Sequence, residues 1–115
     1  MKTIAEYAKN NLQEMANITK KRHPELPANI FIFRNDGISH EPRIKIQRNS
    51  STNVQEYDMF SMTISNKPEI VGNTGKLSSN EVKYFVEFIK RNMKVLIDYW
   101  NAKIYIEDVL ENLKY

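Results

Sequence analysis

Residues 78–101, SSNEVKYFVEFIKRNMKVLIDYWN, contain the pattern that decides the fold class. Ser78 followed by Glu81 has the spacing of a capping box, in which each side chain accepts from the other residue's backbone N–H. Behind it, eight apolar residues recur at spacings of three and four, as on one face of a helix: Val82, Phe85, Val86, Ile89, Met93, Leu96, Ile97 and Trp100. The stretch therefore predicts one long helix, from about Ser79 to Asn101, that covers a core.

Three segments before this helix are typical of β-strands, because they are rich in branched and aromatic residues or alternate between apolar and polar residues. They are residues 29–34, 42–48 and 55–65. In the second of them, Ile44 and Ile46 alternate with Arg43, Lys45 and Gln47, which predicts one buried face and one face in water.

The second and third segments are expected to form a hairpin, and residues 68–71 could add a short edge strand that begins at Pro68. Two amphipathic terminal helices complete the prediction. The first runs from Thr3 to about His23, where Pro24 ends it and Lys20 to His23 place positive charge at its C-terminus. The second follows Asn101 and has its apolar face on Ile106, Val109, Leu110 and Leu113.

The expected fold class is therefore α+β, a single domain of residues 1–115. It has a three- or four-stranded antiparallel sheet packed against a long helix, with amphipathic N- and C-terminal helices. The chain has no cysteine, which excludes disulfides, thiolate nucleophiles and cysteine-ligated metals. No run approaches the ~20 apolar residues that cross a bilayer, and the N-terminus lacks a signal core, so we expect a cytoplasmic protein.

The basic residues are concentrated in the first part of the chain. Residues 1–48 hold nine Lys or Arg against five Asp or Glu, a net charge of +4, whereas residues 49–115 hold eight against nine, a net charge of −1. A dedicated nucleic-acid-binding protein usually shows a steeper imbalance. The bias is mild, and a water-exposed surface is enough to explain it.

Residues 70–101, with Gly75 to Ser78 ahead of a helix that closes on Trp100-Asn101, resemble a family of small bacterial proteins known only as a domain of unknown function. Residues 40–46, His-Glu-Pro-Arg-Ile-Lys-Ile, stand where that family has a His/Pro-rich strand similar to PPHVHV. Arg43 and Lys45 replace the two strand histidines, so no metal or acid–base role carries over. The resemblance implies an α+β domain, often encoded near mobile and toxin–antitoxin-type loci, without an established activity.

Four basic residues around the predicted strands are candidates for contacts with phosphates or acidic side chains: Arg34, Arg43, Lys45 and Arg48. Lys20 to Arg22 are further candidates. The alternative interpretation is that these residues only keep the outer face of the sheet in water.

The two histidines are the residues that an acid–base enzyme would most simply use. His40 adjoins Glu41, but the spacing places no third ligand nearby, and His23 lies at the predicted helix end. We therefore expect no catalytic residue, no metal site and no cofactor, although an enzyme centred on His40 stays open.

A second stripe on the long helix is formed by Tyr84, Phe88, Val95 and Tyr99. Such a broad apolar surface must be covered either by a terminal helix or by a partner, including a second copy of the chain. The leading hypothesis is a non-enzymatic protein-binding or accessory protein of a prokaryote or mobile element, related to toxin–antitoxin or defence systems.

The alternative hypothesis is a nucleic-acid-binding, antitoxin-like or regulatory module that uses the basic strand face. Neither hypothesis involves a membrane. The residues that would contact the partner or nucleic acid are Arg34, His40, Arg43, Lys45, Arg48, Tyr84 and Tyr99.

Overall fold

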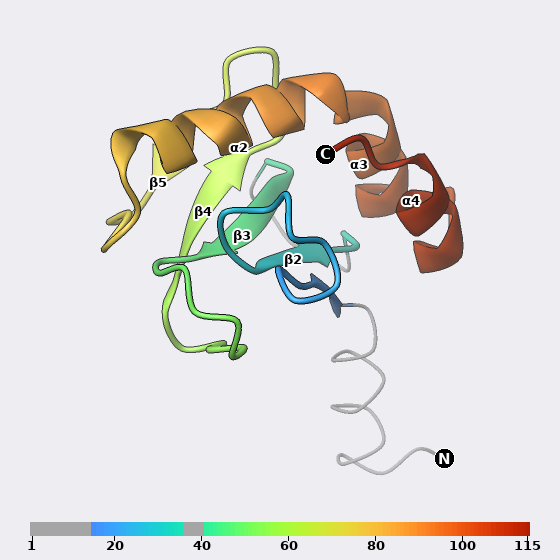
Figure 1. The fold of residues 1–115 in the computed structure, drawn as a ribbon. Helices are drawn as coiled ribbons and strands as arrows, with labels where there is room; N and C mark the ends of the chain where they lie inside the picture. The colour runs from blue at the N-terminus through green and yellow to red at the C-terminus, as the bar shows by residue number, and fades with distance from the viewer. Residues whose placement is uncertain (1–14, 36–40) are drawn as a thin grey trace, which may run out of the picture.

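The computed structural model of the protein describes residues 15–35 and 41–115. They form an α+β fold in which α2 and α3 lie on one face of an antiparallel sheet and α4 lies beside α3 (Figure 1). The strands are β1 (Met15–Ile18), β2 (Ile30–Phe33), β3 (Arg43–Gln47), β4 (Met59–Thr63) and β5 (Ile70–Val71). The helices are α2 (Ser79–Arg91), α3 (Met93–Trp100) and α4 (Ile106–Asn112).

The sheet is a simple meander, because its five strands lie side by side in the order in which they occur in the chain. Ile46 on β3 pairs with Ile30 on β2 and with Phe60 on β4, so apolar side chains from three strands share the face that the helices cover. The expected strands and the hairpin of β3 with β4 are confirmed. The expected number of strands is wrong, since the sheet has five.

The extra strand is β1, which lies where the sequence predicted the end of an N-terminal helix. Residues 3–14 of that helix lie outside the described residues. Over Met15–Ile18 the prediction is wrong, because Ile18 pairs with Ile30 and is 1% exposed, while Asn17 faces the other way and is exposed. A two-residue alternation and pairing to β2 outweigh the helical spacing.

The predicted long helix is also wrong, because it is divided at Asn92 into α2 and α3. The backbone of Asn92 has φ −114° and ψ 18°, outside the helical region, and its side-chain Nδ2 donates to Phe88 O over 2.9 Å. An asparagine side chain competes with the backbone for such bonds, so it weakens a helix interior.

The start of α2 and its buried face agree with the sequence. Ser78 Oγ accepts from Glu81 N over 3.2 Å, and Glu81 Oε1 accepts from Ser78 N over 2.8 Å, which completes the capping box. Phe85 and Ile89 are fully buried against the sheet. The apolar face that was predicted for the long helix is thus the core face of two shorter helices.

The C-terminal helix is confirmed as α4. Val109 is fully buried and Leu113 is 8% exposed, whereas Leu110 is 45% exposed and does not belong to the core. Beyond α4 the chain turns back toward α2, so that the ring of Tyr115 lies 6.0 Å from that of Phe88. The C-terminal segment therefore helps to cover the aromatic side of α2.

Candidate ligand-binding site

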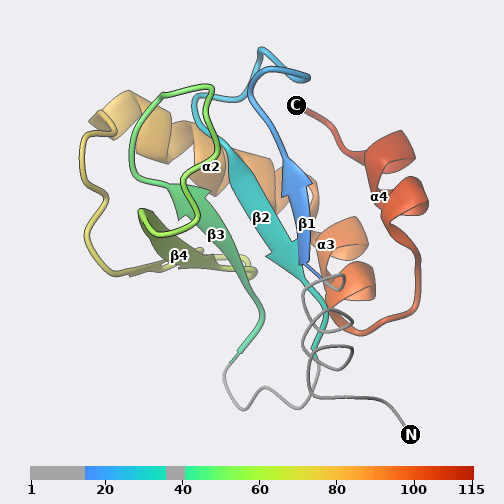
Figure 2. The same ribbon diagram turned by 90° about the horizontal axis from the view of Figure 1, so that it is seen from below.

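Three loops meet at one end of the sheet. Since the strands form an antiparallel meander, alternate connections leave the sheet at the same end, where Figure 2 shows the first two of these loops together. The loops are residues 19–29, 48–58 and 72–78. Lys20 Nζ donates to Ser50 O over 3.1 Å, and Lys76 N donates to Arg48 O over 2.8 Å. The loops thus contact one another, and we call this region the three-loop end.

A buried pair of amide side chains fixes the loop 48–58. Asn29 is 1% and Gln47 0% exposed, and Asn29 Nδ2 donates to Gln47 Oε1 over 3.2 Å. Gln47 Oε1 also accepts from Gln55 N over 2.9 Å, and its Nε2 donates to Asn53 O over 3.1 Å. The expectation that Gln47 faces water is wrong, because the loop folds over it and satisfies its polar atoms.

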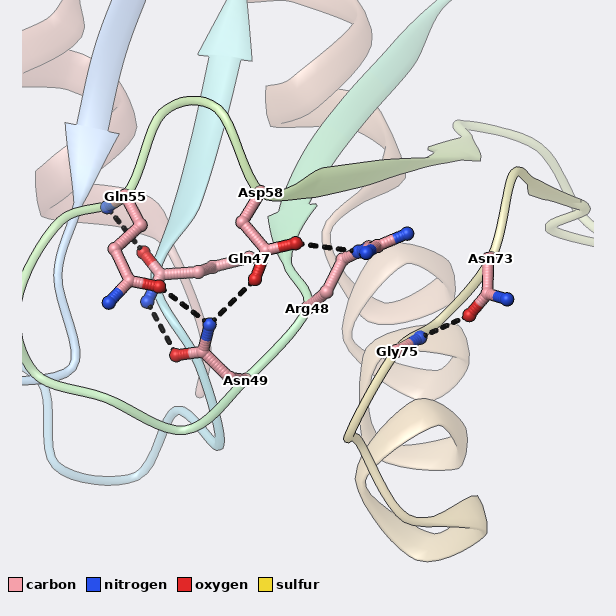
Figure 3. Close-up of polar contacts among 7 residues, drawn as sticks. All are labelled: Gln47, Arg48, Asn49, Gln55, Asp58, Asn73 and Gly75. Carbon is pink, nitrogen blue, oxygen red and sulfur yellow. Dashed lines mark hydrogen bonds and ion pairs between the residues drawn. The ribbon is translucent and has the colours of Figure 1, made fainter.

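A charged pair lies beside this amide pair (Figure 3). Arg48 Nε and Asp58 Oδ1 are 2.7 Å apart, and Asn49 Nδ2 donates to Asp58 Oδ2 over 2.9 Å and to Gln55 Oε1 over 2.7 Å. Both carboxylate oxygens of Asp58 are therefore occupied, and its charge is compensated within the loop. The terminal nitrogens of Arg48 point away from Asp58, as the figure shows.

The turn at Gly75 packs directly on Arg48. Gly75 has φ +64°, and a Cβ at this position would lie 2.6 Å from Arg48 Cβ and 2.8 Å from Arg48 O. Asn73 Oδ1 accepts from Gly75 N over 2.6 Å, which holds the turn closed (Figure 3). Only glycine fits this position, because the backbone conformation and the close approach both disfavour a side chain.

An open pocket of about 470 Å³ lies between the loops 48–58 and 72–78. Its lining is polar and comprises Arg48, Asn49, Ser50, Ser51, Gln55, Tyr57, Asp58, Gly75 and Lys76. Among the described residues, Tyr57 is the most exposed large apolar residue, at 88%. The three loops together carry five basic residues against three acidic ones, which leaves a net charge of +2. The pocket thus combines an exposed ring, two cations and a neutralised carboxylate.

The four basic residues that the sequence singled out do not gather on one surface. Arg34 follows β2 at the end opposite the three-loop end, where its Nη2 donates to Ala102 O over 3.3 Å and its guanidinium lies 5.8 Å from the centre of the Tyr99 ring. Its Nε is buried without a hydrogen-bond partner. Arg34 therefore belongs to the contact between the sheet and α3.

Arg43 and Lys45 do share the sheet face that points away from the helices. Arg43 Nη2 lies 3.3 Å from Glu41 Oε1, while Lys45 is exposed and its Nζ lies 5.3 Å from the centre of the Phe33 ring. Of the four, only Arg48 lines the pocket. His40 lies outside the described residues.

The predicted aromatic stripe is largely internal. Phe88 is fully buried and Tyr99 is 4% exposed. Tyr84 is half-buried, and its ring stacks on that of Phe88 at 6.2 Å. The terminal segment supplies part of the cover through Tyr115, which also stacks on His23 at 4.6 Å. A partner is therefore not needed to shield these rings.

Two tyrosine hydroxyls in this aromatic region, those of Tyr84 and Tyr115, are buried without a hydrogen-bond partner. Burial raises the pKa of both hydroxyls above 10.0, because a phenolate loses its hydration there. Glu25 raises both pKa values further, whereas Arg91 lowers that of Tyr84. Neither phenol is prepared to act as an acid near neutral pH.

A second open pocket, of about 440 Å³, lies where α2, α3 and α4 approach one another. Val95 and Ile104 contribute apolar side chains, and the Lys94–Asp98 ion pair, with Nζ and Oδ2 2.8 Å apart, lies at its rim. Its lining holds no exposed aromatic ring, so it offers less to a ligand with a planar base than the pocket at the three-loop end.

Sequence reasoning missed most of the pocket. Tyr57 lies in residues 55–65, which the sequence assigned to a strand, although β4 begins only at Met59. Lys76 belongs to a segment without periodicity, and the loop around Asn49 looked like an ordinary polar connection. The available signal was the basic run from Lys20 to Arg22, which the sequence assigned to a helix end. In the structure this run begins the loop that follows β1, and Lys20 contacts Ser50 instead of a helix terminus.

Within residues 15–35 and 41–115, no three histidine, aspartate or glutamate side chains come together as metal ligands. Across the same residues, every helix is too short or too polar to span a membrane. Comparison of the chain with family models, with curated proteins and with solved structures gave no match. The site is therefore interpreted from its own geometry.

Proposed function

We propose that this protein binds nucleic acid through the three-loop end of its sheet. The observation that carries the proposal is the open pocket that Arg48 and Lys76 line together with the exposed Tyr57. Basic side chains with an interleaved aromatic residue suit a polymer that presents phosphates and bases.

The surroundings of the pocket support the same ligand class. Lys20, Lys21 and Arg22 follow β1 in the neighbouring loop, and Lys20 already touches the 48–58 loop at Ser50. Asp58, which would repel phosphate, is bonded to Arg48 and Asn49. The net charge of +2 on the three loops favours association with a polyanion.

The test is a binding titration of mixed-sequence DNA and RNA at about 50 mM and 200 mM salt, since phosphate contacts release counterions and make affinity fall with salt. Lys76→Ala should weaken binding and lower the slope of log affinity against log salt by about one unit. Lys94→Ala is the matched control, because Lys94 is an exposed lysine on α3 away from the three loops. Salt-independent binding, or equal effects of the two variants, contradicts the proposal.

The second candidate function is binding of a protein partner, which was the leading hypothesis from the sequence. The observation that favours it is β5, where Ile70 is 46% and Val71 37% exposed on a strand that pairs with β4 on one side. An exposed edge strand can accept another strand, including one from a second copy. Sedimentation analysis of wild type and Val71→Lys tests it, because a charge on the edge should abolish such an association.

A further inference from the structure

We infer that the pocket at the three-loop end holds one unstacked nucleotide of a single strand, with its base on the Tyr57 ring and its phosphate at Arg48 and Lys76. The inference rests on the proposed function and narrows it to single-stranded nucleic acid. The pocket requires an unstacked base, which a duplex does not offer, because bases inside a duplex are stacked and cannot enter a pocket.

The size of the pocket is that of a site for a small ligand, not that of a protein surface that spans a DNA groove. Its volume of about 470 Å³ lies in the range that small-molecule sites occupy. A protein that reads duplex DNA usually presents a helix or a strand pair to the major groove. The three-loop end presents neither, since its pocket is lined by residues 48–51, 55, 57, 58, 75 and 76, all of which lie in loops.

The backbone at Tyr57 is held in place before any ligand arrives. Asp58 N donates to Gln55 O over 3.1 Å, which closes a tight turn around Tyr57, and Arg48 N donates to Asp58 O over 2.9 Å. The side chains of Gln55 and Asp58 are both bonded to Asn49. The backbone of Tyr57 is therefore fixed at both sides while its ring stays 88% exposed. An aromatic ring on a fixed backbone can stack on a base without the cost of ordering a flexible loop.

Two cations, Arg48 and Lys76, line the same pocket as Tyr57. Asp58 fixes Arg48 through Nε and leaves the terminal nitrogens of Arg48 pointing away from the carboxylate (Figure 3). Lys76 is exposed, and its neighbour Gly75 has no side chain to shield the site. Arg48 and Lys76 against Asp58 leave the lining with one positive charge, which matches a single phosphodiester. Glu56, beside Tyr57, is exposed and does not line the pocket.

The experiment compares labelled single strands of about 12 nucleotides, as DNA and as RNA, with the DNA duplex of the same sequence by fluorescence anisotropy at low salt. The inference expects one of the single strands to bind at least about tenfold more tightly than the duplex. Tyr57→Ala should weaken that binding by about 5- to 150-fold, the usual effect of removing one base-stacking ring, whereas Tyr57→Phe should keep it. Because Tyr57 is exposed, neither change should disturb folding, which circular dichroism verifies.

Tyr105→Ala is the matched control, since Tyr105 is a second exposed tyrosine, 70% exposed, that precedes α4 outside the three loops. It should leave every affinity unchanged. Two results overturn the inference that the pocket holds an unstacked nucleotide but leave the proposed function standing. One is salt-dependent binding with equal affinity for the duplex and the single strands. The other is salt-dependent binding in which Tyr57→Ala changes the affinity no more than Tyr105→Ala does. Failure of all three nucleic acids to bind overturns both.

Discussion

The side-chain amide of Asn92 pairs with the backbone of Lys114 as one strand residue pairs with another. Asn92 Nδ2 donates to Lys114 O, and Asn92 Oδ1 accepts from Lys114 N, both over 2.8 Å. The same Nδ2 also donates to Phe88 O over 2.9 Å. One residue at the junction of α2 and α3 therefore both ends a helix and anchors the C-terminal segment.

We expect Asn92→Ala to destabilise the fold by about 2 to 4 kcal/mol, because the amide is 3% exposed and its removal leaves the backbone of Lys114 without partners. Asn112→Ala is the control: Asn112 is exposed and donates only to Asp108 O, so the change should cost below about 1 kcal/mol. Urea unfolding of both variants decides between them. Equal midpoints would show that the anchor contributes nothing.

Truncation of the core face of α2 should be equally costly. Phe85→Ala or Ile89→Ala removes a fully buried side chain, so each should lower the unfolding free energy by about 2 to 5 kcal/mol. Lys83 is exposed on the opposite side of the same helix, and Lys83→Ala should change little. Chemical denaturation of the three variants measures the unfolding free energy. If Lys83→Ala lowers it as much as the other two changes do, Phe85 and Ile89 do not form the core face of α2.

Gln47→Leu should open the loop 48–58 although it replaces a polar residue in the interior with an apolar one. The change leaves Asn29 Nδ2, Gln55 N and Asn53 O without the partner that Gln47 provides. We expect a loss of about 2 to 4 kcal/mol.

Lys45→Leu serves as control on the same strand, because Lys45 is exposed. Hydrogen exchange reports the local effect, and faster exchange at Gln55 N is expected in Gln47→Leu alone. Unchanged protection of that amide contradicts the role given to Gln47.

High pH should weaken the protein through two tyrosines. Burial raises the pKa of Tyr84 and Tyr115 above 10.0, so the folded state keeps protons that the unfolded chain releases from about pH 10 upward. The stabilisation is therefore complete below pH 10 and is lost as the pH rises through the raised values.

Urea midpoints at about pH 8 and pH 11 for wild type and for Tyr84→Phe with Tyr115→Phe measure this effect. The double variant should lose less stability between the two pH values. At the lower pH it should resemble wild type, because both hydroxyls are buried without a partner. An identical fall in the two proteins would exclude these phenols as the cause.

The sequence predicted those parts of the fold that depend on local pattern. The alternation through β3, the aromatic run of β2 and the capping box at Ser78 each reflect neighbours within a few residues, and the structure confirms them. The break at Asn92 could not be predicted in this way, because its partner Lys114 lies 22 residues further along the chain. Local spacing favoured a continuous helix there.

The candidate site was less predictable for the same reason. Gln47 alternates like a residue in water, and only the return of Asn53 and Gln55 across it makes it interior. Arg34 and Arg48 both flank strands, yet the antiparallel order sends them to opposite ends of the sheet. The structure describes six of the seven residues that the sequence singled out, and of these six Arg48 alone lines the pocket at the three-loop end.

The meander order of the sheet has a consequence for how the chain folds during synthesis. Each strand pairs only with its neighbours in the chain, so β1 to β5 can form as successive hairpins with short loop closures. The face of the sheet that carries Ile44, Ile46 and Met62 is covered by α2 and α3. These helices are synthesised after all five strands, and only α4 follows them. Until then the nascent sheet exposes an apolar, aggregation-prone surface. The step that completes the core is therefore the synthesis and packing of residues 79–100.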